Sequence, residues 1–128
     1  MIRFRLAMKP LLALISLLLF ASCVNPELRS RALLAGNWKY ADEIQICQYS
    51  FRTNGSFVGE VRYRSKLVSK FTGRWALKGD ALLYAYTGDA FGRIPAGTTD
   101  RDRLVEVKND SFLIQALNGD RRRYFRIK

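Results

Sequence analysis

Turn-forming residues recur at regular intervals through residues 36–128, and this spacing restricts the possible folds more than any other feature of the sequence. Asn54-Gly55 is the strongest of these signals, because Asn-Gly favours the tight turn of a β-hairpin. Gly79-Asp80, Asn109-Asp110 and Asn118-Gly119 are further turn signals. Turns about ten to twelve residues apart are typical of antiparallel sandwiches and barrels.

The segments between the turns predict eight short β-strands. They cover residues 37–41, 44–52, 57–64, 68–77, 81–87, 104–108, 112–117 and 121–127. No helical period is sustained after Gly36. Eight antiparallel strands are enough to close into a barrel, and closure leaves no unpaired edge. The sequence therefore predicts an all-β fold, with one long loop over residues 88–100.

Apolar and polar residues alternate within the predicted strands, so one face of the sheet is apolar. Phe71, Gly73 and Trp75 share one face of the fourth strand, and Leu82 and Tyr84 share one face of the fifth. This alternation is expected when one face packs on the core and the other meets water. The interior of such a barrel is just wide enough to be filled by side chains or to hold one small ligand. The bulky rings favour a filled interior.

Residues 1–22 have the composition of a secretory signal peptide. Three basic residues and no acidic one precede an apolar run, residues 11–21, which ends in small residues. These are the features of a cleaved signal. The alternative is a retained N-terminal anchor, but a transmembrane helix needs about 20 apolar residues. The uncharged stretch between Lys9 and Glu27 leaves room for only a short span.

Phe20-Ala21-Ser22-Cys23 resembles a bacterial lipobox, the tetrapeptide whose cysteine becomes the lipid-modified first residue of a mature lipoprotein. The resemblance implies diacylglycerol on Cys23 and an acylated amino terminus. Val24 follows and no Asp is present there, which resembles the default pattern for the outer membrane of Gram-negative bacteria. We therefore expect a cell-envelope protein that is lipid-anchored in the outer membrane and faces the periplasm. The alternative is a disulfide between Cys23 and Cys47.

The segment before the strands predicts a short helix. Asn25 is a suitable N-cap, Pro26 suits the first helical turn, and Gly36 ends the helix. The chain then divides into residues 1–22 as a lipoprotein-type signal peptide, residues 23–35 as an anchor segment with a short helix, and residues 36–128 as the barrel.

Gly36-Asn37-Trp38 resembles the opening motif of the lipocalin-like proteins, a Gly-x-Trp on the first strand after a short helical turn. The hairpin over residues 71–82 and the closing Tyr124-Phe125-Arg126-Ile127 are similar to the compact bacterial domains of this family. The resemblance implies an eight-stranded antiparallel up-and-down lipocalin-like barrel. A second family motif, Thr-Asp-Tyr, has no match, because Thr99-Asp100 lacks the tyrosine.

The family resemblance also implies a structural role for the tryptophan of the motif. In the family this residue closes one end of the barrel, and a basic side chain of the last strand packs across it. The contact is a cation–π interaction of roughly 0.5–2 kcal/mol. Gly36 and Trp38 carry the motif here, and Arg123 and Arg126 are both candidates for the basic partner.

The chain contains no histidine, which excludes several classes of chemistry. It cannot form a Ser-His-Asp triad, a His-ligated zinc site or a His-ligated haem site. Asp42-Glu43 and Asp100 with Asp102 are the acidic residues nearest to forming a pair, and we expect neither pair to be catalytic. The sequence therefore predicts a protein that is not an enzyme and that has no metal and no cofactor.

Basic residues outnumber acidic ones, 22 to 11. The leader contains three of the basic residues and none of the acidic ones, so the processed chain keeps an excess of eight. Arg121, Arg122 and Arg123 form the densest basic patch of the sequence. They are either solvated residues at the start of a strand or a site for an anionic partner. Nucleic acid is not expected, because the leader directs the chain to the envelope and acidic residues interrupt the basic ones.

The predicted loop over residues 88–100 carries two apolar side chains, Phe91 and Ile94. They either plug the open end of the barrel or form a lid over a small hydrophobic ligand, with Tyr84 and Tyr86 at the mouth.

Two functions follow from the sequence. The first is a lipoprotein that binds a small hydrophobic or acidic ligand or fills its own core. The second is an envelope interaction protein that docks on an anionic polymer or a partner protein through its basic outer surface.

Overall fold

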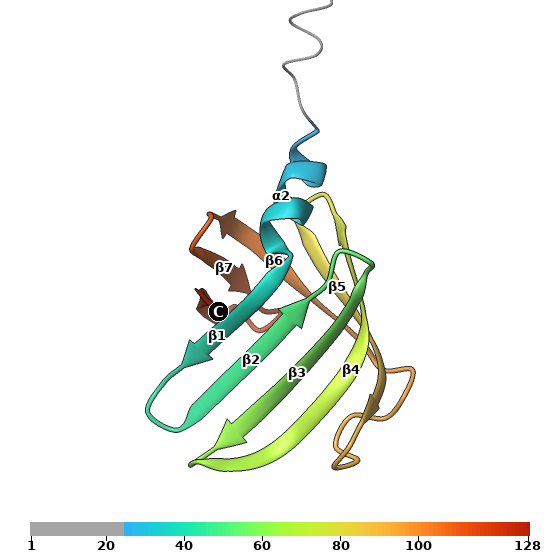
Figure 1. The fold of residues 1–128 in the computed structure, drawn as a ribbon, viewed down its shortest axis with the longest axis vertical. Helices are drawn as coiled ribbons and strands as arrows, with labels where there is room; N and C mark the ends of the chain where they lie inside the picture. The colour runs from blue at the N-terminus through green and yellow to red at the C-terminus, as the bar shows by residue number, and fades with distance from the viewer. Residues whose placement is uncertain (1–24) are drawn as a thin grey trace, which may run out of the picture.

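The computed structural model describes residues 25–128, whose strands close into one barrel (Figure 1). The elements are α2 (Pro26–Leu34), β1 (Gly36–Ala41), β2 (Gln45–Phe51), β3 (Ser56–Tyr63), β4 (Lys66–Lys78), β5 (Ala81–Asp89), β6 (Thr99–Val107), β7 (Ser111–Gln115) and β8 (Arg121–Ile127). Each strand pairs antiparallel with the next, and β8 pairs with β1. This confirms the predicted eight-stranded up-and-down barrel.

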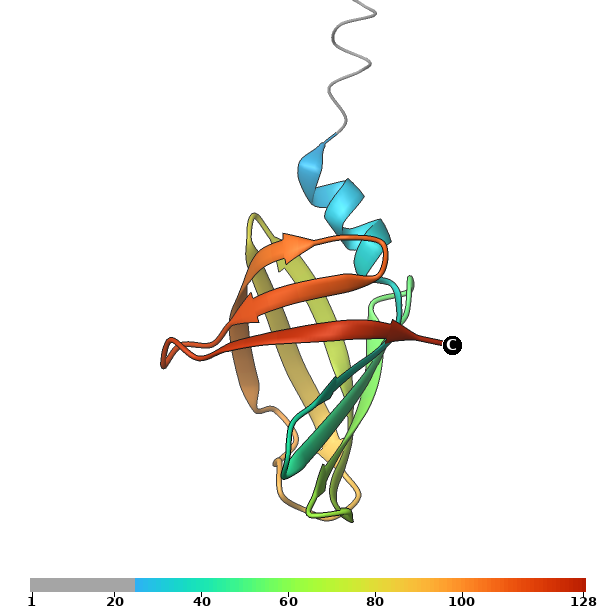
Figure 2. The ribbon, with the colours of Figure 1, turned by 90° about the vertical axis from the view of Figure 1, so that its left-hand side faces the viewer.

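Helix α2 stands at one end of the barrel (Figures 1 and 2). The Oδ1 atom of Asn25 accepts a hydrogen bond from the backbone N–H of Glu27 at 3.0 Å, which is the expected N-cap. The carboxylate of Glu27 accepts one from the backbone N–H of Gly79 at 3.1 Å, and Leu34 is fully buried. These contacts fix the helix against the β4–β5 turn and the barrel core.

The loops divide between the two ends of the barrel. The β2–β3, β4–β5 and β6–β7 turns share the end that carries α2. The β1–β2, β3–β4, β5–β6 and β7–β8 connections lie at the opposite end. All eight strands and the core that they enclose lie within residues 25–128, so a chain that begins at residue 23 contains the whole barrel.

Aromatic rings fill the interior of the barrel, as the alternation predicts. A connected series of ring contacts, with centroids 4.8 to 6.3 Å apart, leads from Trp38 at the α2 end into the barrel through Phe112, Phe51, Phe57 and Tyr86. All five rings are at most 8% exposed. Since each ring touches the next, this part of the interior is filled by side chains.

Strand β6 begins earlier than the sequence predicts, at Thr99 rather than at residue 104. Residues 99–103 pair with residues 81–85 of β5, which shortens the loop to residues 90–98. The prediction was wrong because Asp100, Arg101, Asp102 and Arg103 are all charged. Strand pairing nevertheless places them alternately, with Arg101 opposite Leu83 and Asp102 opposite Leu82.

The β3–β4 turn has no glycine or asparagine, so turn-forming residues do not predict it. Arg64 and Ser65 take φ values of 49° and 68°, in the left-handed region. Positive φ at both central residues is the geometry of the tight hairpin turn that Asn-Gly favours. The flanking pairs, such as Tyr63 with Lys66, hold the turn in place.

Candidate functional site

The end of the barrel next to α2 is closed by Trp38. Its ring is fully buried, and its Nε1–H donates a hydrogen bond to the carbonyl of Leu34 at 2.8 Å. The guanidinium carbon of Arg126 lies 4.2 Å from the centroid of this ring. Arg126 also donates to the carbonyls of Leu33 at 2.7 Å and Ala35 at 3.1 Å. The side chain therefore ties the end of the helix to the last strand across the tryptophan.

Gly36 and Arg123 occupy different positions in this arrangement. Gly36 has a φ of 138°, and a Cβ atom there would overlap the Nη1 of Arg126. Arg123 lies away from Trp38, because it donates to the Oγ of Ser111 at 3.1 Å and lies 3.6 Å from the Oε1 of Glu106. Of the two candidate partners, Arg126 is therefore the one over the tryptophan.

The run Arg121, Arg122 and Arg123 is divided between the two faces of β8. Successive residues of a strand point to opposite faces. Arg121 donates to the Oε1 of Gln115 at 3.1 Å, whereas Arg122 lies over the ring of Tyr40, 5.0 Å from its centroid. Alternation therefore separates Arg122 from Arg121 and Arg123, which share the other face of β8. An anionic partner for this basic run stays a prediction.

The predicted ligand mouth is only partly assembled. Tyr84 and Tyr86 are 6% and 8% exposed and belong to the core. Ile94 packs against the same core from the β5–β6 loop, as a plug would. Phe91 points to solvent and is 52% exposed. The loop therefore does not place both of its apolar residues over an opening.

A polar network lies among the buried tyrosines. The hydroxyl of Tyr84 donates to the Oδ2 of Asp102 at 2.9 Å. Burial raises the pKa of the Asp102 carboxyl, and it holds the pKa values of Tyr49 and Tyr84 well above the ordinary 10.0. Burial also raises the pKa of Tyr86 to about 12. These phenols remain protonated at neutral pH, and the hydroxyl of Tyr84 serves as a hydrogen-bond donor inside the barrel.

The buried phenols predict that the free energy of unfolding falls as the pH rises above 10. In the unfolded chain each phenol ionises near 10.0, whereas in the folded barrel the pKa of Tyr86 is about 12 and burial raises the pKa values of Tyr49 and Tyr84 well above 10.0. Between these values the unfolded state releases protons that the folded state keeps, so stability is complete below pH 10 and is lost above it. Urea unfolding at a series of alkaline pH values measures the loss. Ultraviolet titration in which all six tyrosines ionise together near pH 10 contradicts this account.

Cys47 is 2% exposed on the inner side of β2, as expected for a cysteine that behaves as a small apolar residue. Its Sγ lies 3.1 Å from the Nε2 of Gln45. Burial raises the pKa of the thiol, which keeps it in the unreactive protonated form. Cys23, the predicted lipidation site and the alternative disulfide partner, lies outside the described residues.

Asp42, one of the acidic residues considered for catalysis, holds the backbone of a loop in place. Asp42 accepts hydrogen bonds from the backbone N–H groups of Ile44 at 2.9 Å and Gln45 at 2.8 Å, which lowers the pKa of its carboxyl and shapes the β1–β2 loop. Within residues 25–128 no group of three or more Cys, Asp or Glu side chains is placed to hold a metal ion. In the same part of the chain no helix is long and apolar enough to span a membrane.

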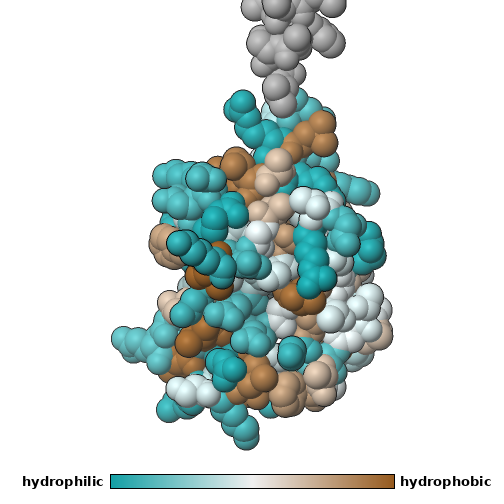
Figure 3. Space-filling model, viewed as in Figure 1, coloured by the Kyte–Doolittle hydropathy of each residue, from teal (hydrophilic) through white to brown (hydrophobic). Residues whose placement is uncertain are grey.

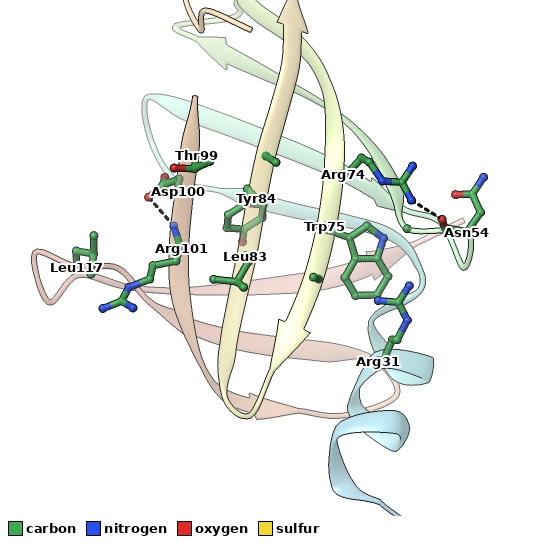
Figure 4. A pocket seen from close by; sticks show the side chains of 13 residues that line it. Arg31, Asn54, Arg74, Trp75, Leu83, Tyr84, Thr99, Asp100, Arg101 and Leu117 are labelled. Atoms are coloured by element: carbon green, nitrogen blue, oxygen red, sulfur yellow. Dashed lines mark hydrogen bonds between the residues drawn. The ribbon is translucent and has the colours of Figure 1, made fainter. Parts of the chain in front are cut away.

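A groove of about 740 Å³ crosses the outer face of β4, β5 and β6 (Figure 4). Short or aliphatic side chains form its floor, because the β4–β5 register sets Ala76 opposite Leu83 and Arg74 opposite Ala85. Two alanines between longer side chains leave the sheet surface recessed. In Figure 4 the two walls differ in their side chains. One wall carries Arg31 and Arg74, and the other carries Thr99, Asp100, Arg101 and Leu117.

Arg31 and Arg74 bring two guanidinium groups to the same corner of the groove. The guanidinium carbon of Arg31 lies 4.4 Å from the centroid of the Trp75 ring. The Nη2 of Arg74 donates to the carbonyl of Asn54 at 3.1 Å. A Cβ atom at Gly55 would lie 2.9 Å from the Nη2 of Arg74 and 3.7 Å from that of Arg31, so both nitrogens approach one point. Neither arginine is paired with a carboxylate of residues 25–128.

The sequence alone does not predict this groove. Arg31 belongs to the helix and Arg74 to β4, 43 positions apart, and only the helix packing and the β2–β3 turn bring them together. The available signal was the outward alternation Arg74, Ala76 on β4 and Leu83, Ala85 on β5, which exposes small apolar residues next to a basic one.

Comparison with known proteins finds a solved structure with a similar fold. No protein-family model and no curated protein matches the sequence. Among solved structures, the chain is similar to a lipocalin-like protein from Bacteroides uniformis ATCC 8492. The two share 18% sequence identity and a TM-score of 0.54, over 74% of this chain and 99% of the other. The likeness at this identity is one of fold, and with the strand order it shows that residues 36–128 form a lipocalin-like barrel.

Proposed function

We propose that this chain is a lipid-anchored, non-enzymatic protein of the bacterial cell envelope that binds an anionic envelope component on the outside of its barrel. The filled interior is the observation that carries this proposal. A ligand inside the barrel must displace part of a continuous series of buried rings, from Trp38 to Tyr86. Loss of packed aromatic contacts is costly, on the order of 3–5 kcal/mol for a whole ring. The outer surface is available without that cost.

The charge of the outer surface supports an anionic partner. Within residues 25–128 three basic side chains are paired with carboxylates, namely Arg62, Lys108 and Arg123. The remaining arginines and lysines of this part of the chain have no carboxylate partner, although Arg126 is held by the Trp38 ring and by backbone carbonyls. The exposed side chains among them attract anions. Figure 3 shows a largely hydrophilic face over β1 to β4, on which apolar areas are separated from one another. This surface favours polar and ionic contacts over a broad apolar interface.

The leader and the position of α2 support the lipid anchor. Only Val24 and Asn25 separate Cys23 from the first residue of the helix. Since an extended chain spans about 3.5 Å per residue, a lipid on Cys23 would hold the start of α2 within about 11 Å of its own attachment point. The barrel would then stay at the membrane surface, with its α2 end towards the lipid.

Cys23→Ser is expected to release the protein from the membrane. The serine cannot carry the thioether-linked lipid, and acyl chains supply about 0.8 kcal/mol per buried CH₂ group. Fractionation of cells that express the full chain measures the change: the unmodified protein sediments with membranes and the variant does not. Cys47→Ser is the matched control and should sediment as the unmodified protein does. A Cys23→Ser variant that still sediments with membranes excludes the anchor.

Surface binding has its own test, which does not depend on the anchor. The Cys23→Ser chain beginning at residue 23 is expected to be retained on beads coated with lipopolysaccharide and to elute as salt is raised, because exposed charges are screened. Beads that carry a neutral polysaccharide are the control. Equal retention on both kinds of beads contradicts the proposed binding of an anionic component.

A further inference from the structure

We propose that the groove over β4, β5 and β6 is a binding site for a single-chain amphipathic anion. The anionic head, a phosphate or a group of the same charge, lies between Arg31 and Arg74, and the apolar chain lies along Ala76, Leu83 and Ala85. This inference rests on the proposed function and names both the site and the chemical class of its ligand.

The head end of the site is defined by the two guanidinium groups. They approach the same point beside Gly55 without a carboxylate of the described residues between them, so their charges repel each other. An anion at that point relieves the repulsion and accepts charge-assisted hydrogen bonds from both. Stacking on Trp75 and the bond to Asn54 hold the two side chains in place before the ligand arrives. Less conformational entropy is therefore lost on binding.

The apolar part of the site is the recessed floor. Ala76 and Leu83 are half-buried and Ala85 is exposed, all on the outer face of the sheet. Leu117, at the far wall, is 74% exposed and gains a covering from a chain that crosses the floor. A volume of about 740 Å³ lies within the range of small-molecule sites, about 300–1,000 Å³.

The two walls differ in charge. Arg101 lies opposite Leu83 in the β5–β6 register and shares the outer face with the floor, whereas Asp100 lies opposite the buried Tyr84. The far wall therefore presents one guanidinium group, and the corner formed by Arg31 and Arg74 presents two (Figure 4). Two charged donors make that corner the stronger site for the anionic head.

Calorimetric titration of the Cys23→Ser chain beginning at residue 23 with decyl phosphate tests the site. The Arg31→Gln, Arg74→Gln double variant is expected to lose about tenfold or more in affinity, because it removes both charged donors. The matched control is the double variant Arg103→Gln, Arg121→Gln. These arginines also converge on one point, but there the Oε1 of Gln115 accepts from both at 3.1 Å. The control should change the affinity by less than about twofold.

A third variant separates the floor from the head. Leu83→Ser is expected to weaken decyl phosphate about threefold to tenfold, because it removes part of the apolar floor, and to leave the weak binding of inorganic phosphate unchanged. Thermal unfolding of each variant shows whether the barrel is intact. The proposal is overturned by equal losses in the two arginine double variants, or by a Leu83→Ser variant that binds decyl phosphate as well as the unsubstituted chain does.

Two further measurements identify the source of the ligand and distinguish failure of this inference from failure of the proposed function. The first measures retention of the protein on vesicles of phosphatidylcholine with phosphatidylglycerol. If the unsubstituted chain is retained and the Arg31→Gln, Arg74→Gln double variant is not, the anionic head belongs to a bilayer lipid. Binding of decyl phosphate without such retention assigns it to a free single-chain amphiphile. If lipopolysaccharide beads retain the protein but decyl phosphate does not bind, the groove inference fails and the proposed function stands. If neither anionic material binds, both fail.

Discussion

Replacement of Trp38 by Ala is expected to lower the free energy of unfolding by about 3–5 kcal/mol. The ring is fully buried, and it contacts Phe112 edge-on at a centroid distance of 4.8 Å. Its removal leaves a cavity at the closed end of the barrel. It also leaves the carbonyl of Leu34 without its hydrogen bond and Arg126 without the ring beneath it. Urea unfolding followed by circular dichroism measures the loss.

Phe125→Ala is the matched control for the tryptophan variant. Phe125 is also a large ring at this pair of strands, since it lies opposite Lys39 in the β1–β8 register, but it is 56% exposed. Its truncation should cost no more than about 0.5 kcal/mol, as is usual for surface positions. Equal losses in the two variants contradict the assignment of Trp38 to a buried closing position.

Replacement of Gly73 by Ala is expected to destabilise the barrel by about 1–3 kcal/mol, although alanine adds only one methyl group. A Cβ atom at this position overlaps the backbone carbonyl of Ala85 and lies 2.6 Å from a ring carbon of Phe57. Backbone in a closed barrel cannot move aside as the end of a flexible side chain does. The strain should appear as a lower urea midpoint with an unchanged slope.

Gly88→Ala isolates the effect of crowding from that of losing a glycine. Gly88 lies on the neighbouring strand, opposite Thr72, and a Cβ atom there meets nothing within 4 Å. A Gly→Ala change at an uncrowded position that alanine can adopt stabilises a protein by up to about 1 kcal/mol through the unfolded state. Similar destabilisation in Gly73→Ala and Gly88→Ala means that the inner face of β4 is less tightly packed than the structure shows.

Residues that favour turns and helix caps predicted much of the fold. The turn at Asn54-Gly55 occurs as expected, with a φ of 89° at Gly55, and the cap on α2 is the predicted Asn25. The exceptions are places where tertiary contacts override local preference. Residues 99–103 look like a polar loop until the pairing with β5 and the bond from Tyr84 to Asp102 are known.

Contacts between distant segments were not predictable from a single sequence. The β1–β8 register sets Trp38 opposite Arg126, which places this arginine and not Arg123 over the ring. The corner formed by Arg31 and Arg74 likewise depends on how the helix meets the β2–β3 turn. The separation of Arg122 from its neighbours was predictable, because strand alternation alone requires it.

The packed interior of the barrel supports the groove on its outer face. Large rings fill the inside, and this packing makes the sheet stiff enough to hold Arg74, Ala76 and Leu83 at fixed spacing on the outside. Helix α2 adds Arg31 to the same surface. If Cys23 is lipidated, the short connection to α2 brings this surface close to the membrane, where amphipathic anions are abundant.

The most direct test of this account is a nuclear magnetic resonance titration that locates a bound amphiphile inside or outside the barrel. The chain beginning at residue 23, with Cys23→Ser and isotope labels, is titrated with decyl phosphate. We predict that the backbone amide resonances of Arg74, Ala76 and Leu83 shift with the ligand, while the ring resonances of Phe57 and Phe71 stay in place. Shifts centred on the rings of Phe57 and Phe71, with the outer strand positions unchanged, contradict the account, because they place the ligand inside a barrel that the structure shows to be filled.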